Sequence, residues 1–408
     1  MHKRTVIIQQ YGCTRTFNLL LRFSLLLTMF IMLLLLSSCD KPITPNNEVP
    51  GPGFYSLFNG KDMSGWILGV EVEESSWSVV DGVIHCKGGP QNPYLITTEK
   101  EYENFEFYAE FKVSKGCNSG IFYHIPEAGR QSFLGFETQI LDDHGKTPDK
   151  NSTGSIYDVV PPLENAMKKA GKWNQYHVIF DWPSCKVWLN GVLVQDTDFE
   201  AYPRLKYRMR RGPLGLSNHG HEVDYRNLWI KELPDTDTGR DIFNGTDLAG
   251  WTAVGDADWH VGDGVLVSTR GEGYLVTDKE YDNLYFHAYV DSDTLKTRDA
   301  CFYYRWTSED NPGYRADMYD YLNAVKDAKQ YGDDIPADLV RPIKSNWFLY
   351  RIISGDRKSQ VYLNEFLVSD NKMLLKPPRG KIAIYRGVND GVIKIKGLTL
   401  RPLEGPGI

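Results

Sequence analysis

The sequence predicts an all-β protein built from two tandem sandwich domains, and three observations support this fold class. The chain of 408 residues is long enough for two or three domains, and 13% of its residues are aromatic, as is common in sandwich cores and on sugar-binding faces. A set of short motifs occurs twice in the same order. Most other segments are short, alternate apolar with polar residues and are separated by Gly, Asn or Asp turns. Many short strands of this kind favour two packed sheets over a parallel α/β sheet.

The N-terminal segment is predicted to be a bacterial lipoprotein signal peptide. Basic residues precede a largely apolar run at residues 25–36, which is the layout of a secretory signal. The run ends in Leu-Ser-Ser-Cys at Cys39, and small residues before a Cys resemble the lipobox at which the thiol receives a diacylglycerol. A transmembrane anchor is the alternative, because about 20 apolar residues can span a bilayer. The Pro- and Gly-containing tether at 39–53 favours a lipid-anchored protein in the periplasm or at the cell surface.

Cysteine usage and charge exclude several classes of protein. Besides Cys13 in the signal and Cys39, four scattered cysteines remain, and no CxxC pair suggests zinc or a disulfide framework; they are Cys86, Cys117, Cys185 and Cys301. We expect them to be buried small apolar residues. The net charge of −7 offers no basic stripe for nucleic acid. No phosphate-binding or nicotinamide-binding loop is visible, so a redox role of this chain is not expected.

The internal repeat defines the domain organisation. Phe58-Asn59-Gly60 recurs as Phe243-Asn244-Gly245, and each copy is followed by Gly-Trp at the same spacing. Further matches keep the same order along the chain: Trp77 with Trp259, Tyr94 with Tyr274, Phe122 with Phe302, and Leu189-Asn190-Gly191 with Leu363-Asn364-Glu365. We therefore predict five regions: a signal peptide at 1–38, a tether at 39–53, a first sandwich at 54–233, a linker at 234–240 and a second sandwich at 241–404.

Strands are indicated by alternation with a period of two. Residues 105–113 interleave Phe, Ala and Val with charged residues, and residues 136–140 and 176–180 follow the same pattern. Helix is expected to be scarce. Only residues 166–170 and 321–328 have the composition of short helical turns between strands.

Polar residues of the first copy are predicted to collect on one open face. Alternation within 136–140 places Glu137 and Gln139 opposite the core-facing apolar residues. A second segment directs Ser217 and His219 outward, and a third directs Arg226 outward. Each of these residues, taken singly, is more commonly part of a solvated sheet face or a turn. Together they predict that carboxylate, amide, imidazole and guanidinium groups converge on one surface.

Several ordered motifs resemble the 3-keto-disaccharide hydrolase family. The motifs of the first copy that carry the resemblance are Asn118-Ser119-Gly120, Gly135-Phe136-Glu137-Thr138-Gln139, Thr153-Gly154-Ser155-Ile156-Tyr157, Gly171-Lys172-Trp173, Leu216-Ser217-Asn218-His219-Gly220 and Tyr225-Arg226-Asn227-Leu228. The resemblance covers residues 54–233 and continues more weakly over 241–403. It implies two tandem concanavalin A/laminin G-like jelly-roll β-sandwiches. Two departures are Ser217-Asn218, where the family usually has Gln-Asp, and His124, where an Arg is more usual.

The resemblance also implies a chemistry, the cleavage of 3-keto-glycosides. A ketone at C3 acidifies the C2 proton, so that the bond at C1 can break by elimination, which needs a base, a donor or cation for the enolate oxygen, and an acid. His219, with an ordinary pKa near ~6.5, is the predicted base or acid, Glu137 is the alternative base, and Arg226 would stabilise the negative charge. Residues expected to contact the substrate are Gln139, Asn118, His124, Tyr157, Asp142 and Ser217. A sugar 3-dehydrogenase would act upstream.

Three further hypotheses stay open at this point. Glu137, His144 and His219 are candidate ligands of a divalent metal that polarises the ketone, although no ligand spacing enforces this site. The protein is alternatively a non-catalytic carbohydrate-binding lipoprotein. A conventional glycoside hydrolase would need paired carboxylates, such as Glu137 and Asp142, ~5–5.5 Å or ~6.5–9.5 Å apart.

The second copy keeps the framework and loses the polar set. Glu137 aligns with Arg315 and Gln139 with Asp317, and the segment that holds His219 becomes Tyr385-Arg386-Gly387. We therefore predict that the first copy is catalytic and that the second is structural or sugar-binding. A different pocket formed by Arg315, Asp317 and Arg386 is the alternative.

Overall fold

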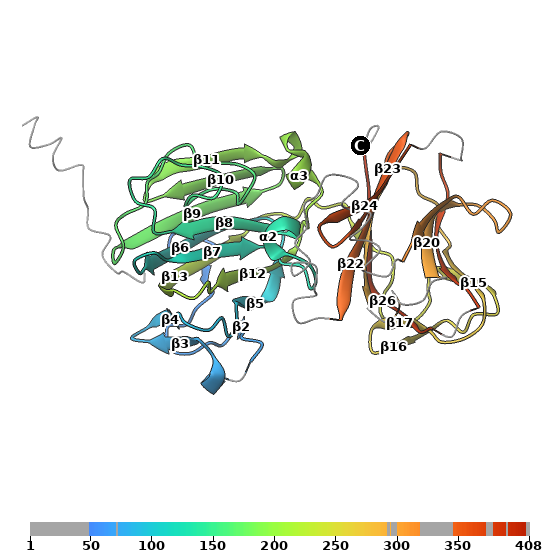
Figure 1. Ribbon diagram of the computed structural model, residues 1–408, viewed down its shortest axis with the longest axis horizontal. Helices are drawn as coiled ribbons and strands as arrows, with labels where there is room; N and C mark the ends of the chain where they lie inside the picture. Colours follow the sequence, from blue (N-terminus) through green and yellow to red (C-terminus); the bar gives the residue numbers. More distant parts are fainter. Residues whose placement is uncertain are drawn as a thin grey trace, which may run out of the picture. The chain divides into compact units, whose positions relative to one another are not determined.

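The computed structural model describes residues 49–70, 72–291, 294, 300–318, 346–372, 378–388 and 391–404. In this part of the chain, antiparallel strands dominate and form two sandwiches, each with an eight-stranded and a five-stranded sheet (Figure 1). The predicted signal peptide, Cys39 and the expected helical turn at 321–328 lie outside the described residues. None of the helices that are described has the length and hydropathy of a membrane span.

The first sandwich runs from β1 to β13. Its eight-stranded sheet contains, in spatial order, β11 (Val192–Asp198), β10 (Ser184–Leu189), β9 (Trp173–Asp181), β6 (Phe105–Val113), β13 (Glu222–Glu232), β4 (Val83–Lys87) and β3 (Trp77–Val80), with β1 (Tyr55–Ser56) paired to β13. Its five-stranded sheet contains β2 (Trp66–Ile67), β5 (Leu95–Tyr102), β12 (Gly212–Ser217), β7 (Asn118–Tyr123) and β8 (Phe136–Leu141). Short helical segments connect some of these strands: η1 (Val72–Glu74), α2 (Gln131–Leu134), η2 (Phe199–Ala201) and α3 (Pro203–Lys206).

The second sandwich repeats this strand order. Its eight-stranded sheet contains β16 (His260–Gly262), β17 (Val265–Ser268), β26 (Ile393–Pro402), β19 (Leu284–Asp291), β22 (Trp347–Ser354), β23 (Lys358–Leu363) and β24 (Phe366–Lys372), with β14 (Arg240–Asp241) paired to β26. Its five-stranded sheet contains β15 (Trp251–Gly255), β18 (Gly273–Thr277), β25 (Lys381–Arg386), β20 (Ala300–Trp306) and β21 (Tyr314–Asp317). The predicted all-β class with two sandwiches is confirmed.

Each sandwich has its own apolar core between its two sheets. In the first, Phe107 and Phe111 of β6 and Ile121 of β7 are at most 1% exposed and belong to one cluster, as the alternation predicted. The four cysteines are free and buried, which confirms the prediction made for them. Burial raises the pKa of the Cys117 thiol to about 12, which makes this thiol unreactive at neutral pH.

One predicted helical turn is wrong. Residues 166–170 form no helix. The Asn190 side chain donates a hydrogen bond to the backbone oxygen of Ala166 (2.8 Å), and Asn165 accepts one from the backbone of Met167 (3.0 Å). These side chains satisfy the backbone in an irregular loop, so it gains nothing from helical hydrogen bonds.

The strand register refines the correspondence between the two copies. Glu137 pairs with Phe122 between β8 and β7, and Arg315 pairs with Tyr303 between β21 and β20. Ile121 and Phe302 belong to the cores of their sandwiches, whereas Tyr303 belongs to the cluster on the other face of its sheet, so Phe122 corresponds to Tyr303 and not to Phe302. Their strand partners Glu137 and Arg315 are then equivalent, as predicted. A shift of one residue matters because it moves a side chain to the other face of the sheet.

Candidate active site

Glu137 lies on the face of the five-stranded sheet that points away from the core. Phe136 and Ile140 of β8 belong to the core cluster, and Glu137 and Gln139 alternate with them, as predicted. However, Glu137 is only 3% exposed, so this face is sheltered and not solvated. The backbone amide of Tyr157 donates a hydrogen bond to the backbone oxygen of Glu137 (3.0 Å), which brings the Tyr157 loop to the free edge of β8.

Gly120 makes room for the Glu137 carboxyl group. Gly120 lies on β7, next to β8, and a Cβ atom at this position would overlap with Glu137 Oε1. Only glycine therefore allows the carboxyl group to lie flat across the neighbouring strand. The Asn118-Ser119-Gly120 motif carried this signal in the sequence, although its physical meaning depends on the strand register.

The environment keeps Glu137 protonated at neutral pH. Burial raises the pKa of Glu137 to about 8, and the charges of Arg130 and Arg208 lower it without offsetting the burial. A carboxylic acid with this pKa can donate a proton near neutral pH and can accept one back after reaction.

His219 lies just beyond the end of β12 and contacts Tyr94. Its Nε2 is 3.3 Å from the Tyr94 hydroxyl, and the two rings meet edge to face with centroids 5.0 Å apart. The backbone amide of Asn218 donates a hydrogen bond to the backbone oxygen of Tyr94 (2.7 Å), which holds the two segments together. Burial lowers the pKa of His219, as does the nearby His221, so the imidazole is neutral at neutral pH and able to accept a proton.

Tyr94 connects His219 with the surroundings of Glu137. Burial raises the pKa of Tyr94, the charges of Glu137 and Tyr157 raise it further, and Arg130 lowers it. Tyr94 therefore keeps its proton and remains a hydrogen-bond donor. In the sequence Tyr94 was only a marker of the repeat, because nothing local distinguishes it from a core tyrosine.

Two arginines that sequence reasoning missed lie near Glu137. Arg130 precedes α2, and its guanidinium carbon lies 3.8 Å from the centre of the Phe133 ring. Arg208 is 2% exposed and donates from Nη1 to the backbone oxygens of Ser132 (2.8 Å) and Gly135 (2.9 Å). Arg208 thus holds the turn that leads into β8, whereas Arg130 is the less enclosed of the two cations.

The expectation that Arg226 joins Glu137 is wrong. Arg226 lies on β13 in the eight-stranded sheet, where its neighbour Tyr225 fills the core. Its Nε is 2.7 Å from Glu110 Oε2, and its guanidinium stacks 3.9 Å from the Trp173 ring centre. Alternation identifies the outward side of a strand but not its sheet, and the outer faces of two packed sheets point in opposite directions.

His124 is a core residue and not a substrate contact. It is 0% exposed, and its Nε2 and Nδ1 lie 2.7 Å and 3.0 Å from the backbone oxygens of Glu103 and Met209. Its ring packs edge to face on Phe180, with centroids 4.6 Å apart. Burial lowers the pKa of His124 to about 4, although the two backbone oxygens raise it. The prediction for His124 is therefore wrong, because the sequence does not show that the chain turns inward there.

Asp142 and His144 are also placed away from the predicted roles. Asp142 Oδ2 accepts a hydrogen bond from the backbone of Gly116 (2.9 Å) beyond the end of β8, so it closes a turn. His144 Nδ1 lies 2.5 Å from the backbone oxygen of Met167. Among the described residues, no three His, Cys, Asp or Glu side chains are grouped as metal ligands, so Glu137, His144 and His219 do not form the expected cluster.

The remaining predicted substrate contacts lie on strands or loops of the site. Gln139 Oε1 accepts a hydrogen bond from the backbone of Ile140 (2.9 Å). Asn118 Oδ1 and the Ser217 hydroxyl are shielded from solvent and have no partner among the described residues. Buried polar atoms are normally satisfied, so Asn118 and Ser217 are the positions best suited to receive hydroxyl groups of a ligand.

The corresponding face of the second sandwich is filled. An apolar cluster occupies it, and its ring members include Tyr274, Tyr303, Trp306 and Tyr385. Arg315 forms an ion pair with Asp317, and Arg386 Nη1 donates to the backbone oxygens of Ser268 (3.1 Å) and Gly391 (2.6 Å). Among the described residues, the polar set of the first copy is not reproduced here, as predicted.

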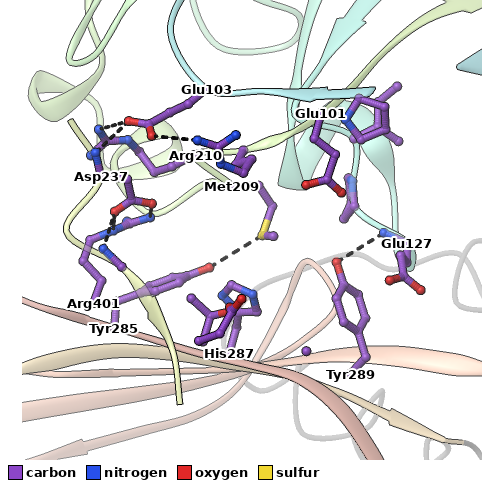
Figure 2. A pocket seen from close by; sticks show the side chains of 18 of the residues that line it. Glu101, Glu103, Glu127, Met209, Arg210, Asp237, Tyr285, His287, Tyr289 and Arg401 are labelled. Atoms are coloured by element: carbon purple, nitrogen blue, oxygen red, sulfur yellow. Dashed lines mark hydrogen bonds and ion pairs between the residues drawn. The ribbon is translucent and has the colours of Figure 1, made fainter. Parts of the chain in front are cut away.

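A separate cavity of about 900 Å³ is shown in Figure 2. Its lining includes Met209, Tyr285 and His287, and none of the predicted site residues. Two of its charged pairs are already satisfied within the protein, namely Glu103 with Arg210 (3.2 Å) and Asp237 with Arg401 (2.5 Å). We therefore place the candidate active site at Glu137 and not in this cavity.

The fold defines a class of protein, the antiparallel β-sandwich. Its first sandwich holds, in sheltered positions, a carboxyl group with a raised pKa, an imidazole with a lowered pKa and polar atoms without a partner among the described residues. The chain belongs to the family of 3-keto-alpha-glucoside-1,2-lyase-like domains, whose model matches residues 53–231 and again 238–401.

The chain is also similar to individual proteins. The 3-keto-disaccharide hydrolase of Bacteroides thetaiotaomicron is 27% identical, with 45% of this chain and 80% of the relative covered. Two solved structures from Parabacteroides distasonis, both described as candidate glycosyl hydrolases, are 28% and 26% identical. They cover 45% and 44% of this chain and 94% and 99% of their own chains, with TM-scores of 0.38 and 0.39.

Proposed function

We propose that the first sandwich cleaves 3-keto-α-glucosides by elimination followed by hydration. The observation that carries this proposal is the pairing of a protonated Glu137 with a neutral His219 around the Tyr94 side chain. Membership of the lyase-like family and the name of the curated relative support the substrate class.

In the first step the imidazole of His219 takes the proton from C2 of the keto sugar. The electron pair of the C–H bond forms a C2–C3 double bond, and negative charge develops on the oxygen at C3. Tyr94, which keeps its proton, donates a hydrogen bond to this oxygen, and Arg130 supplies positive charge nearby. Arg130 and Tyr94 thus replace Arg226 in the role first expected of it.

In the second step the C1–O bond breaks. The enolate electrons form the C1–C2 double bond, and Glu137 gives its proton to the departing oxygen, which releases an alcohol and an unsaturated keto sugar. Water then adds at C1 while Glu137 takes back a proton and His219 returns one to C2. The net reaction is hydrolysis of the glycosidic bond.

A direct comparison of substrates tests this function. The full chain is incubated with a 3-keto-α-glucosyl disaccharide, whose leaving group is a sugar alcohol that needs a proton, and with the unoxidised parent, and the released monosaccharide is measured by chromatography. We expect cleavage of the keto sugar alone, and a decrease in kcat of about 10²- to 10⁴-fold in His219→Ala and in Glu137→Gln. Cleavage of the parent would instead indicate a conventional glycoside hydrolase, and binding without cleavage would indicate a carbohydrate-binding protein.

We further propose that the chain is held at a bacterial membrane by lipid on Cys39. The apolar run that ends at Cys39 and the tether that follows it support this location. Because an oxidised sugar is required as substrate, a sugar 3-dehydrogenase must act before this enzyme.

A further inference from the structure

We infer that the second sandwich positions Arg130 beside the active site of the first, by holding the segment that runs from Glu127 to Arg130. This inference rests on the proposed function, because Arg130 matters to the rate only if negative charge develops near it. It gives the second copy, whose own sheet face is filled, a role in the reaction of the first.

Three polar contacts from the second sandwich hold this segment. The backbone amide of Arg130 donates to Glu365 Oε2 (3.2 Å), in the turn between β23 and β24. The backbone amide of Glu127 donates to the Tyr289 hydroxyl (3.2 Å), a contact drawn in Figure 2. Lys396 Nζ lies 2.5 Å from Glu127 Oε2. Two of these contacts hold backbone atoms, so they fix the path of the chain.

Apolar contacts hold the same segment from the side. Ala128 and Leu134 form a buried cluster with Tyr289 and Leu349 of the second sandwich. Gly129 has a φ of 81°, and a Cβ atom there would overlap with Leu134 and lie 3.1 Å from Asn364. The segment is therefore closely packed on both its polar and its apolar sides.

The turn that contains Glu365 differs between the two copies in a way that suits this role. The first copy has Asn190-Gly191, with positive φ at both residues, whereas the second has Asn364-Glu365, with positive φ only at Asn364. A hairpin turn gains nothing locally from Glu in place of Gly. Glu365 Oε2 accepts the hydrogen bond of the Arg130 amide, while Oε1 is shielded from solvent and has no partner among the described residues. The buried carboxyl group therefore has its described hydrogen bond at the segment that holds Arg130.

A short, rigid connection links Arg130 to Glu137. The backbone oxygen of Arg130 accepts hydrogen bonds from the backbone amides of Phe133 and Leu134 (both 3.0 Å), which closes α2 directly before β8. Arg208 donates a hydrogen bond to the backbone oxygen of Gly135, the residue between α2 and β8, and so holds the other end of this turn. Displacement of the Arg130 backbone therefore moves its guanidinium relative to Glu137.

The test uses the full chain with Glu365→Ala, Glu365→Gln and, as a matched control, Glu280→Ala at an exposed ion pair of the second sandwich. We expect kcat for a 3-keto-α-glucosyl disaccharide to fall about tenfold in Glu365→Ala, with KM nearly unchanged, because one stabilising charge is misplaced. Glu365→Gln keeps an oxygen acceptor for the Arg130 amide and should restore most of the rate. Glu280→Ala should behave like the wild type.

The pH profile separates positioning from loss of structure. Arg130 and Arg208 act on the pKa of Glu137 through their charges, and the charge of Glu137 raises the pKa of Tyr94 and Tyr157. Arg130 contacts the second sandwich through its backbone amide. Displacing Arg130 should therefore move the alkaline limb of the rate upward by about half a unit, less than a directly paired arginine would cause. If Glu365→Ala does not fold, Tyr289→Phe, which removes only the hydroxyl bound to Glu127, is measured in its place.

The possible outcomes are distinct. A wild-type rate and alkaline limb in the Glu365→Ala variant, with an inactive Glu137→Gln variant, would overturn the positioning role alone. Full activity in Glu137→Gln and His219→Ala would overturn the proposed function itself. A slowed Glu365→Ala variant that Glu365→Gln does not rescue would also contradict a role based on the acceptor oxygen.

Discussion

At the scale of single residues, the proposed activity depends on the protonation states of Glu137 and His219. Burial acts on both but in opposite directions, because it disfavours the charged form of each group. It raises the pKa of the acid and lowers that of the base. Between the two pKa values, Glu137 is protonated and His219 is neutral at the same time, and this pair of states is the one that the elimination requires.

The rate should therefore show a bell-shaped dependence on pH. We expect kcat/KM to fall on the acid side at a pKa below the ordinary value of histidine, 6.5, because a protonated His219 cannot accept the C2 proton. It should fall on the alkaline side near pH 8, where Glu137 loses its proton. Rates measured with a 3-keto-α-glucosyl disaccharide across this range check both limbs, and a rate that keeps rising well above pH 8 would contradict the role of Glu137.

At the scale of strands, alternation predicted the faces correctly and the sheets only in part. It placed Glu137 and Gln139 opposite the core, which the structure confirms. It could not show that Arg226 belongs to the other sheet, because the assignment of strands to sheets depends on long-range pairing. It could not find Tyr94 or Arg130 either, since both lie just outside strands and reach the site only through the fold.

Two arginine variants test this assignment of elements. Arg226→Ala should keep kcat within about twofold of the wild type and lower the free energy of unfolding by about 1–3 kcal/mol, because Glu110 loses its charged partner in a buried place. Arg130→Ala should show the opposite pattern, a large decrease in kcat with little change in stability. Thermal unfolding and steady-state rates measure both, and loss of activity only in Arg226→Ala would reverse the assignment.

At the scale of the whole molecule, duplication has produced two sandwiches with different tasks. Arg315 stands in the second copy where the first has the acid Glu137. Cys301 stands where the first copy has Gly120, the glycine that makes room for the Glu137 carboxyl group, so the second sheet face no longer accommodates a carboxyl group. The family match over both copies shows that the framework survives this loss. The contacts of Glu365 and Tyr289 then explain how the altered copy can still affect the reaction.

The proposed lipid anchor is tested at Cys39. Cys39→Ser removes the thiol that would carry the diacylglycerol, so the expressed protein should move from the membrane fraction to the soluble or uncleaved precursor fraction and lose labelling by a fatty-acid precursor. The purified domains should keep their activity, because the tether separates them from the lipid. Unchanged membrane association and labelling of the variant would exclude lipid attachment at this residue.

The most direct measurement is the fate of hydrogen at C2 when the enzyme works in deuterated water. If His219 removes the C2 proton and the unsaturated sugar is then hydrated, the 3-keto sugar that is released should carry deuterium at C2, which nuclear magnetic resonance detects. A sample of the same keto sugar kept without enzyme corrects for spontaneous exchange. Because His219 can return the same proton, a substrate deuterated at C2 is measured as well, and elimination predicts a primary isotope effect on its cleavage. Cleavage that leaves the original hydrogen at C2 and shows no such isotope effect would contradict elimination and require a direct displacement at C1.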